Sequence, residues 1–151
     1  MEKFLVFNKS ITDSIVNRLE KLNHDSKPKW GNMSAAQMLA HVTVPLEIAH
    51  GKKTQAVNPI FKFLFGKSLK PYVFGNKPYK QNLPTFKEAK MVEPQEFDAQ
   101  KEKFIEYIIT YQKGGRDAII DKHPFFGNLS EEEWQIMQGK HIDHHFNQFG
   151  I

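Results

Sequence analysis

Cysteine is absent from the 151-residue chain. Disulfide bonds, thiolate nucleophiles and thiolate metal sites are therefore excluded. A transition-metal site in this protein would have to be built from histidine, aspartate, glutamate or water. The absence of cysteine thus directs the search for chemistry to the seven histidines and the carboxylates.

Long apolar runs are also absent. No stretch approaches the roughly 20 apolar residues that span a bilayer. The first ten residues, "MEKFLVFNKS", lack the extended apolar core and the cleavage site of a signal peptide. We therefore expect no transmembrane segment and a cytoplasmic location. The length predicts one domain, residues 1–151, that is large enough to bury a core without cross-links.

Acidic residues are missing from Ile48 to Lys87, a stretch that contains eight lysines. The whole chain has a net charge of +4, so the remaining residues carry a net charge of −4. Such a basic segment could attract an anionic ligand, a nucleic acid or a membrane surface, or it could form a solvated lysine-rich surface. Arginine is scarce, and Arg18 and Arg116 both lie outside the stretch. This scarcity argues against a nucleic acid as the partner.

Helical periodicity predicts an all-α protein. The apolar residues recur at helical spacing in four segments, approximately residues 12–23, 34–51, 94–112 and 130–150. Ser34 with Gln37, and Ser130 with Glu133, form capping boxes at the starts of the second and fourth segments. The simplest architecture is a four-helix bundle with one long crossover connection between the second and third helices.

That long connection, residues 52–93, is rich in both helix breakers and aromatic side chains. Four prolines and two glycines interrupt it, and seven phenylalanines and tyrosines make it too apolar for a disordered linker. The segment "NPIFKFLFGK" could form a short helix. We expect an ordered connection that packs over one end of the fold, where long loops often contribute to function.

Three of the seven histidines cluster near the C-terminus in "GKHIDHHFNQFG". At 100° per residue, His141 and His145 lie in the middle of the apolar stripe of the last helix, and His144 lies at its edge. Side chains at positions i and i+4 share one helical face. Two imidazoles so placed can bind one metal ion through bonds of about 2.0–2.1 Å.

A third ligand should come from a facing helix. His41 is the only other histidine on an apolar helical face, that of the second helix. Three neutral nitrogens would leave a coordination position for water or substrate, as in catalytic sites. The alternative is that these are ordinary packed histidines, because an HxxxH pair alone is a weak motif.

Other patterns are weaker. "EIAH", Glu47 to His50, matches half of a carboxylate-bridged di-iron motif. The helical wheel places Thr43, Glu47 and His50 on the outward side, so we discount that motif. His144 could act as an acid or base beside the metal or could simply pack there. His123 could line the mouth of the site.

Three stretches resemble a known superfamily: "WGNMSAAQMLAHV" (30–42), "HPFFGNLSEEEW" (123–134) and "KHIDHHFNQFG" (140–150). They are similar to the DinB/YfiT-like metalloenzymes, specifically an uncharacterised subfamily. The resemblance implies a four-helix bundle and one divalent metal ion, with zinc, nickel, manganese and iron all suitable. Its ligands would be His41, His141 and His145. Characterised members include thiol S-transferases, a glutathione-dependent isomerase and amide hydrolases, and members often form homodimers.

Two interpretations follow from the sequence. In the first, the protein is a metal-dependent enzyme acting on a small molecule, either as a thiol S-transferase with a low-molecular-weight thiol as co-substrate or as a hydrolase. His144 is then the candidate catalytic residue. In the second, it is a non-catalytic, stress-associated helical protein that docks on nucleic acid or a membrane surface through residues 52–87.

Overall fold

The computed structural model describes residues 4–75 and 77–151, and it is mostly helical. The all-α prediction is therefore confirmed. The helices are α1 (Lys9–Leu19), α2 (Ala35–Ala49), α3 (Pro59–Phe74), α4 (Phe97–Gly114) and α5 (Glu131–Phe149), with short 3₁₀ turns η2 (Lys87–Ala89) and η3 (Gly115–Ala118). A two-residue antiparallel pair, β1 (Lys122–His123) and β2 (Gly127–Asn128), precedes α5.

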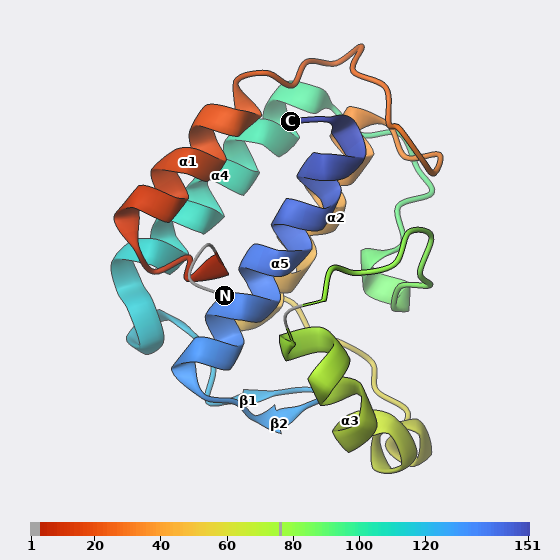
Figure 1. The fold of residues 1–151 in the computed structure, drawn as a ribbon, viewed down its shortest axis with the longest axis vertical. Coiled ribbons are helices and arrows are strands. Elements are labelled where there is room, and N and C mark those ends of the chain that lie inside the picture. The colour runs from red at the N-terminus through yellow and green to blue at the C-terminus, as the bar shows by residue number, and fades with distance from the viewer. Residues whose placement is uncertain (1–3, 76) are drawn as a thin grey trace.

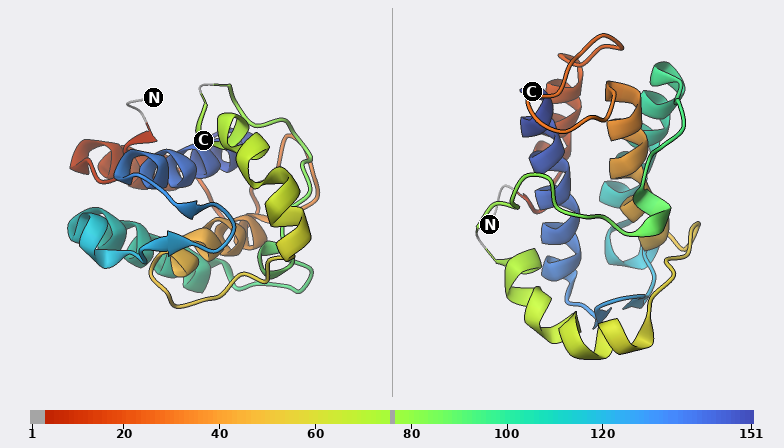
Figure 2. Two further views of the ribbon diagram at one scale, coloured as in Figure 1. Left: turned by 90° about the horizontal axis from the view of Figure 1, so that it is seen from below. Right: turned by 90° about the vertical axis from the view of Figure 1, so that its right-hand side faces the viewer.

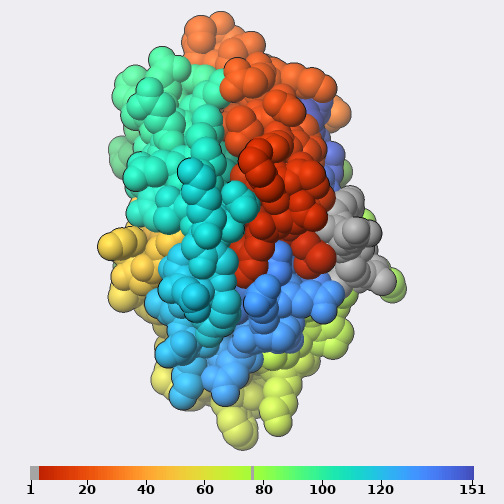
Figure 3. Space-filling view, turned by 90° about the vertical axis from the view of Figure 1, so that its left-hand side faces the viewer, coloured from red at the N-terminus to blue at the C-terminus, as the bar shows by residue number. Residues whose placement is uncertain are grey.

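Four helices, α1, α2, α4 and α5, run alongside one another and enclose the main core, whereas α3 lies across one end beside the β1–β2 hairpin (Figure 1). On the face shown in Figure 3, α1 and α4 lie against each other and the atoms of α3 project at the end of the molecule. Within the described ranges, no helix combines the length and the apolar character that crossing a membrane requires.

Both predicted capping boxes are present. The Ser34 hydroxyl accepts a hydrogen bond from the Gln37 backbone N–H, and the Gln37 side chain accepts one from the Ser34 N–H. Ser130 and Glu133 make the same reciprocal pair at the start of α5. These caps satisfy backbone donors that a helix leaves free. They thereby define where α2 and α5, the two helices with the clustered histidines, begin.

The prediction that Thr43, Glu47 and His50 point outward from α2 is wrong. Thr43 and Glu47 are 1% and 8% exposed, because α4 covers that side of the helix. The Glu47 carboxylate forms ion pairs with Lys103 of α4 at 2.6 Å and with Lys53 at 3.2 Å. His50 is half-buried and packs edge-on against tyrosine rings of α4. Glu47 and His50 are thus engaged with other groups, which still argues against a di-iron motif.

The long connection contains a full helix. Instead of a short helix, α3 extends over 16 residues. The Lys140 ammonium of α5 closes its C-terminal end by donating to the carbonyl oxygens of Tyr72, Val73 and Gly75, at 2.8, 3.3 and 2.8 Å. Residues 77–89 then cross between α5 and α2 and end in η2 (Figure 2, right). We call residues 77–89 the strap.

Candidate metal centre

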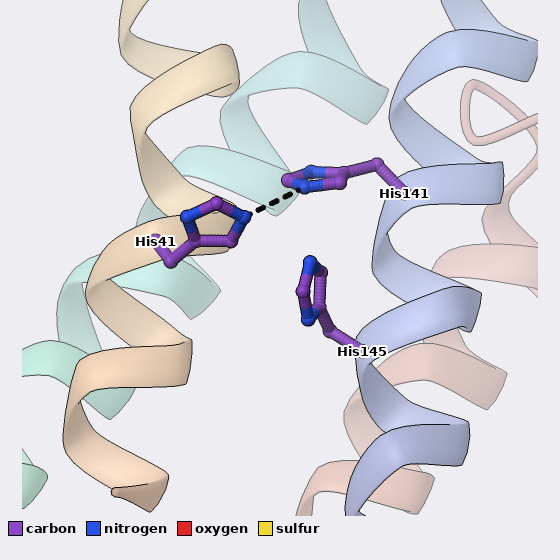
Figure 4. Close-up of side chains that lie close together, drawn as sticks. All are labelled: His41, His141 and His145. Carbon is purple, nitrogen blue, oxygen red and sulfur yellow. Dashed lines mark hydrogen bonds between the residues drawn. The ribbon is translucent and has the colours of Figure 1, made fainter. Parts of the chain in front are cut away.

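Three histidines converge between α2 and α5 (Figure 4). His41 comes from α2, and His141 and His145 come from successive turns of α5. One ring nitrogen of each lies within 4.8 Å of the others. His41 and His145 are buried, and His141 is half-buried. In the described part of the chain, no other group of three histidine or acidic side chains meets this condition.

The His41 ring is oriented by a backbone carbonyl at the end of the strap. Its Nδ1 lies 2.6 Å from the Ala89 carbonyl oxygen. A carbonyl oxygen only accepts, so Nδ1 of the neutral ring carries the hydrogen and Nε2 keeps its lone pair. This Nε2 points at His141 (Figure 4). The strap therefore selects the tautomer of His41 that can coordinate through Nε2.

His145 is oriented by Gln148, one turn further along α5. Its Nδ1 lies 2.8 Å from the Gln148 Oε1. The Gln148 Nε2 in turn donates to the Trp30 carbonyl oxygen at 2.7 Å, which identifies Oε1 as the end of the amide that faces the histidine. His145 therefore donates from Nδ1 and presents a lone pair at Nε2. Hydrogen bonds of this kind hold metal-binding histidines in place.

His141 and His41 approach each other through their Nε2 atoms. Their Nε2 atoms are 3.0 Å apart, whereas Nδ1 of His141 is buried without a hydrogen-bond partner. Two metal–nitrogen bonds of about 2.0–2.1 Å would place their nitrogens 3.0 Å apart at a bond angle of roughly 95°. The spacing therefore suits two ligands of one ion. The buried Nδ1 of His141 lacks a partner whether Nε2 binds an ion or donates to His41, so the argument for a shared ion depends on the spacing of the nitrogens.

All three rings are held neutral. Burial lowers the pKa of His141 well below its ordinary value, and the neighbouring histidines lower it further. Burial and the nearby His41 lower the pKa of His145 to about 3. Burial also lowers the pKa of His41, although its hydrogen bond to Ala89 partly opposes the effect. A histidine must be neutral to bind a metal ion, so these pKa shifts favour ligation at neutral pH.

His144 lies beside the triad but is not part of it. Its ring centroid is 5.0 Å from that of His145, and the rings of Trp30 and Tyr79 lie 5.8 and 5.9 Å away. It is half-buried, and burial lowers its pKa. His144, Trp30, Tyr79 and Asn147 line a surface cavity of about 400 Å³. His144 therefore lies where a proton could pass between this cavity and the histidine cluster.

His123 does not line the mouth of this site, so that prediction is wrong. It lies in β1 and packs against Trp134 at a ring distance of 5.4 Å. Trp134 precedes His141 by two turns of α5, about 10 Å along the helix. The Nδ1 of His123 accepts hydrogen bonds from the backbone N–H groups of Phe125 and Phe126. This histidine organises the hairpin.

Sequence reasoning missed the groups that orient the ligands. The role of Gln148 could have been predicted, because it follows His145 by three residues and side chains at this spacing are neighbours on a helix. The role of Ala89 could not, because every residue has a backbone carbonyl oxygen. Trp30 lies in one of the stretches that carry the superfamily resemblance, but its backbone carbonyl, which holds Gln148, is again independent of side-chain type.

A family model described as "Protein of unknown function (DUF1569)" matches residues 5–150, and the chain belongs to this family. No curated protein and no solved structure matches the chain. The family description assigns no activity. Function therefore has to be inferred from the chemistry of the site.

Proposed function

We propose that this member of the DUF1569 family is a metal-dependent enzyme in which His41, His141 and His145 bind one divalent cation. The convergence of three ligand nitrogens within 4.8 Å is the observation that supports the proposal most directly. Neutral imidazoles suit zinc, nickel and iron, and manganese is the fourth candidate. Three protein ligands would leave a position open, as catalytic sites do.

The residues present fit such an ion. The donor set contains only neutral nitrogens, and Ala89 and Gln148 keep two of the rings in the ligating tautomer. A bound divalent cation would lower the pKa of a coordinated water or thiol towards neutrality. His144 would accept or donate the proton at the edge of the cavity. Trp30 and Tyr79 would shield the reacting groups from bulk water.

The reaction we propose is thiol S-transfer or hydrolysis on a small molecule. The lengthwise arrangement of α1, α2, α4 and α5 fits the four-helix bundle of the DinB/YfiT-like superfamily, to which the sequence has a resemblance. In the transferase version a low-molecular-weight thiol is the co-substrate. The partly aromatic cavity of about 400 Å³ suits a small substrate.

Elemental analysis of protein purified without an affinity tag tests metal binding. We expect about one equivalent of zinc, nickel, manganese or iron per chain, and its loss in His41→Ala and His145→Ala. His24→Ala is the matched control, because His24 is exposed and pairs with the adjacent Asp25 at the surface. Wild-type protein that holds no metal after loading and desalting would overturn the proposal, as would ligand variants that retain it.

A second variant separates catalysis from metal binding. His144→Gln should keep the full metal content, because His144 is not among the three converging ligands. Its thiol-transfer or amide-hydrolysis rate should fall by about 10²–10⁴-fold if His144 transfers a proton. The assay compares metal-loaded and chelator-treated protein. An unchanged rate would remove His144 from the mechanism and leave the metal site standing.

A further inference from the structure

The first two turns of α3 expose an unusual amount of apolar surface. Five apolar side chains on these turns are exposed to solvent, and we call them the α3 patch. Their exposed fractions are 71% for Ile60, 49% for Phe61, 86% for Phe63, 60% for Leu64 and 43% for Phe65. Contiguous exposed apolar surface of this kind usually marks an interaction site. The patch is continuous with the hairpin, because the Phe61 ring lies 4.7 Å from that of Phe65 and 5.8 Å from that of Phe125.

Helix α3 is apolar on its outer side as well as on the side that faces the protein. Leu69 and Val73 face the protein, and Gly66 approaches the Phe125 carbonyl. At 100° per residue, Ile60 and Leu64 lie on the opposite side, where a surface helix normally carries polar residues. A second apolar face of this helix, with Ile60 and Leu64, therefore points away from the core and is exposed to solvent.

The charge around the α3 patch is positive. Lys62 and Lys67 are exposed on the same turns, within the stretch from Ile48 to Lys87 that has eight lysines and no acidic residue. The acidic side chains at this end of the molecule include Asp121, which precedes β1 and pairs with Arg116 at 3.5 Å, and those of the first turn of α5, where Glu133 pairs with Lys70 at 3.3 Å. An apolar helix flanked by lysines is complementary to an anionic surface with an apolar interior.

We propose that α3 docks this protein on the surface of an anionic lipid bilayer. Ile60, Phe63 and Leu64 enter the boundary between headgroups and acyl chains, and the flanking lysines contact the lipid phosphates. Ile60 and Leu64 lie between the phenylalanines and cannot stack on bases, and the stretch from Ile48 to Lys87 contains no arginine; both features disfavour single-stranded nucleic acid. A two-fold self-contact would bring the same lysines of both copies together, which disfavours a second copy as the occupant.

The position of α3 suits this role. It lies at one end of the molecule and projects from it (Figures 1 and 3), so a bilayer could reach the patch without contacting the four core helices. Lys140 fixes only its C-terminal turn, opposite to the exposed end of the helix. The docked helix leads through the strap to the histidine cluster, but the patch residues are separate from the metal ligands. Membrane docking by α3 can therefore be tested separately from metal binding by the three histidines.

Vesicle co-sedimentation of the full chain tests the proposal. Wild-type protein should bind phosphatidylcholine vesicles that contain phosphatidylglycerol at least about tenfold more tightly than pure phosphatidylcholine, because the lysines favour anionic lipid. The double substitution Ile60→Ser/Phe63→Ser should weaken binding to the anionic vesicles at least about tenfold, because it removes the inserted apolar groups. Its matched control is Val92→Ser, which alters a 67% exposed apolar residue outside the patch and should bind like wild type.

Charge is tested separately. Lys67→Glu should weaken binding to the anionic vesicles, whereas Lys90→Glu, an exposed lysine beyond the stretch, should not. Far-UV circular dichroism and the urea midpoint of every variant should match those of wild type, which shows that each variant folds whether or not the protein binds a metal. Equal binding to both vesicle types, or a double variant that binds like wild type, would overturn the proposal. So would a wild-type dimer that the double substitution converts to a monomer, or tighter binding to a single-stranded oligonucleotide than to vesicles.

Discussion

Two of the three clustered histidines, His41 and His145, are each oriented by a single neighbouring acceptor. Ala89 provides that acceptor for His41 and Gln148 provides it for His145. A ring held at Nδ1 cannot turn away from the centre without losing this hydrogen bond. The preorganisation of the site therefore resides in residues that never contact the ion, and it can be tested without altering a ligand.

Replacement of Gln148 should weaken metal binding. Gln148→Ala removes the acceptor for His145 Nδ1–H and leaves both His145 and the Trp30 carbonyl without their partner. Losing such an orienting group typically lowers metal affinity by about 10–100-fold. Competition titration against a chromophoric chelator measures this. Asn147→Ala is the control, because Asn147 is exposed on the same helix, and equal affinities for the two variants would contradict the orienting role.

At this scale the sequence predicted which side chains meet but not how they are held. The helical wheel of α5 and the apolar face of α2 brought together His41, His141 and His145, and the superfamily resemblance pointed to the same three residues. The sequence could not predict that the Ala89 carbonyl orients His41, because the path of the strap determines where this backbone acceptor lies. The burial that lowers the histidine pKa values likewise depends on the packed structure.

The helices themselves depend on close approaches that their sequences hardly reveal. Gly139 lies inside α5, and a Cβ atom there would lie 2.5 Å from the Phe4 carbonyl oxygen and 2.8 Å from the Phe4 Cα. The N-terminal segment can pass this closely only because Gly139 has no side chain. Gly66 in α3 is different, since the nearest atom to its Cβ would be 3.9 Å away.

These two helical glycines form a matched pair for a stability experiment. Gly66→Ala should raise the free energy of unfolding by up to about 1 kcal/mol, because alanine has the higher helix propensity. Gly139→Ala should lower it by about 1–3 kcal/mol, because backbone atoms would have to move apart. Urea unfolding measures both. A stabilised Gly139→Ala variant would show that Phe4 does not pack there.

The hairpin should make the protein sensitive to acid. Burial, aided by the nearby Lys62, lowers the pKa of His123 from 6.5 to about 4. Between pH 6.5 and about pH 4, His123 is therefore protonated in the unfolded chain but neutral in the folded chain. The free energy of unfolding should fall between about pH 6.5 and pH 4, by at most about 3 kcal/mol from this residue, and level off below that range.

His123→Asn isolates this effect. Asparagine keeps a side-chain oxygen that can accept from the N–H groups of Phe125 and Phe126, but it does not titrate in this range. Denaturant unfolding of both proteins between pH 7 and pH 4 gives the comparison. The variant should lose less stability over this interval, and parallel curves for the two proteins would contradict the assignment to His123.

The element types were largely predictable, whereas their surroundings were not. The capping boxes of α2 and α5 can be read directly from Ser34 and Ser130. The outward placement of Glu47 was wrong because α4 covers the second face of α2. The many apolar residues of α2 indicate this burial, because a helix that is apolar nearly all round is buried. The length of α3 was underestimated because its prolines suggested breaks, although Pro59 lies at the helix start, where proline is tolerated.

In the whole molecule, the strap connects the end of α3 to the cluster of His41, His141 and His145. One side is held by Lys140, whose ammonium reaches three carbonyl oxygens at the end of α3 and lies 4.5 Å from the centroid of the Tyr79 ring. The other is held by the bond between His41 and Ala89. The strap is therefore fixed at both ends, and loosening one end should change its dynamics more than the core.

Lys140→Met should release α3 and the strap. Methionine fills a similar volume but cannot donate to the three carbonyl groups, so the last turn of α3 loses its cap. Hydrogen exchange should become faster in residues 66–75 and in the strap. Exchange in α4, which Lys140 does not contact through any of these bonds, should be unchanged. Equal exchange of α3 in both proteins would mean that its packing alone holds it in place.

X-ray absorption at the zinc edge of the metal-loaded protein counts the nitrogen ligands at the ion and so tests whether the three histidines bind it together. The account predicts three imidazole nitrogens at about 2.0–2.1 Å in the wild-type protein. It predicts one imidazole fewer in each of His41→Ala, His141→Ala and His145→Ala, provided the variant still retains zinc. Spectra without imidazole scattering, or spectra that all three substitutions leave unchanged, would contradict it.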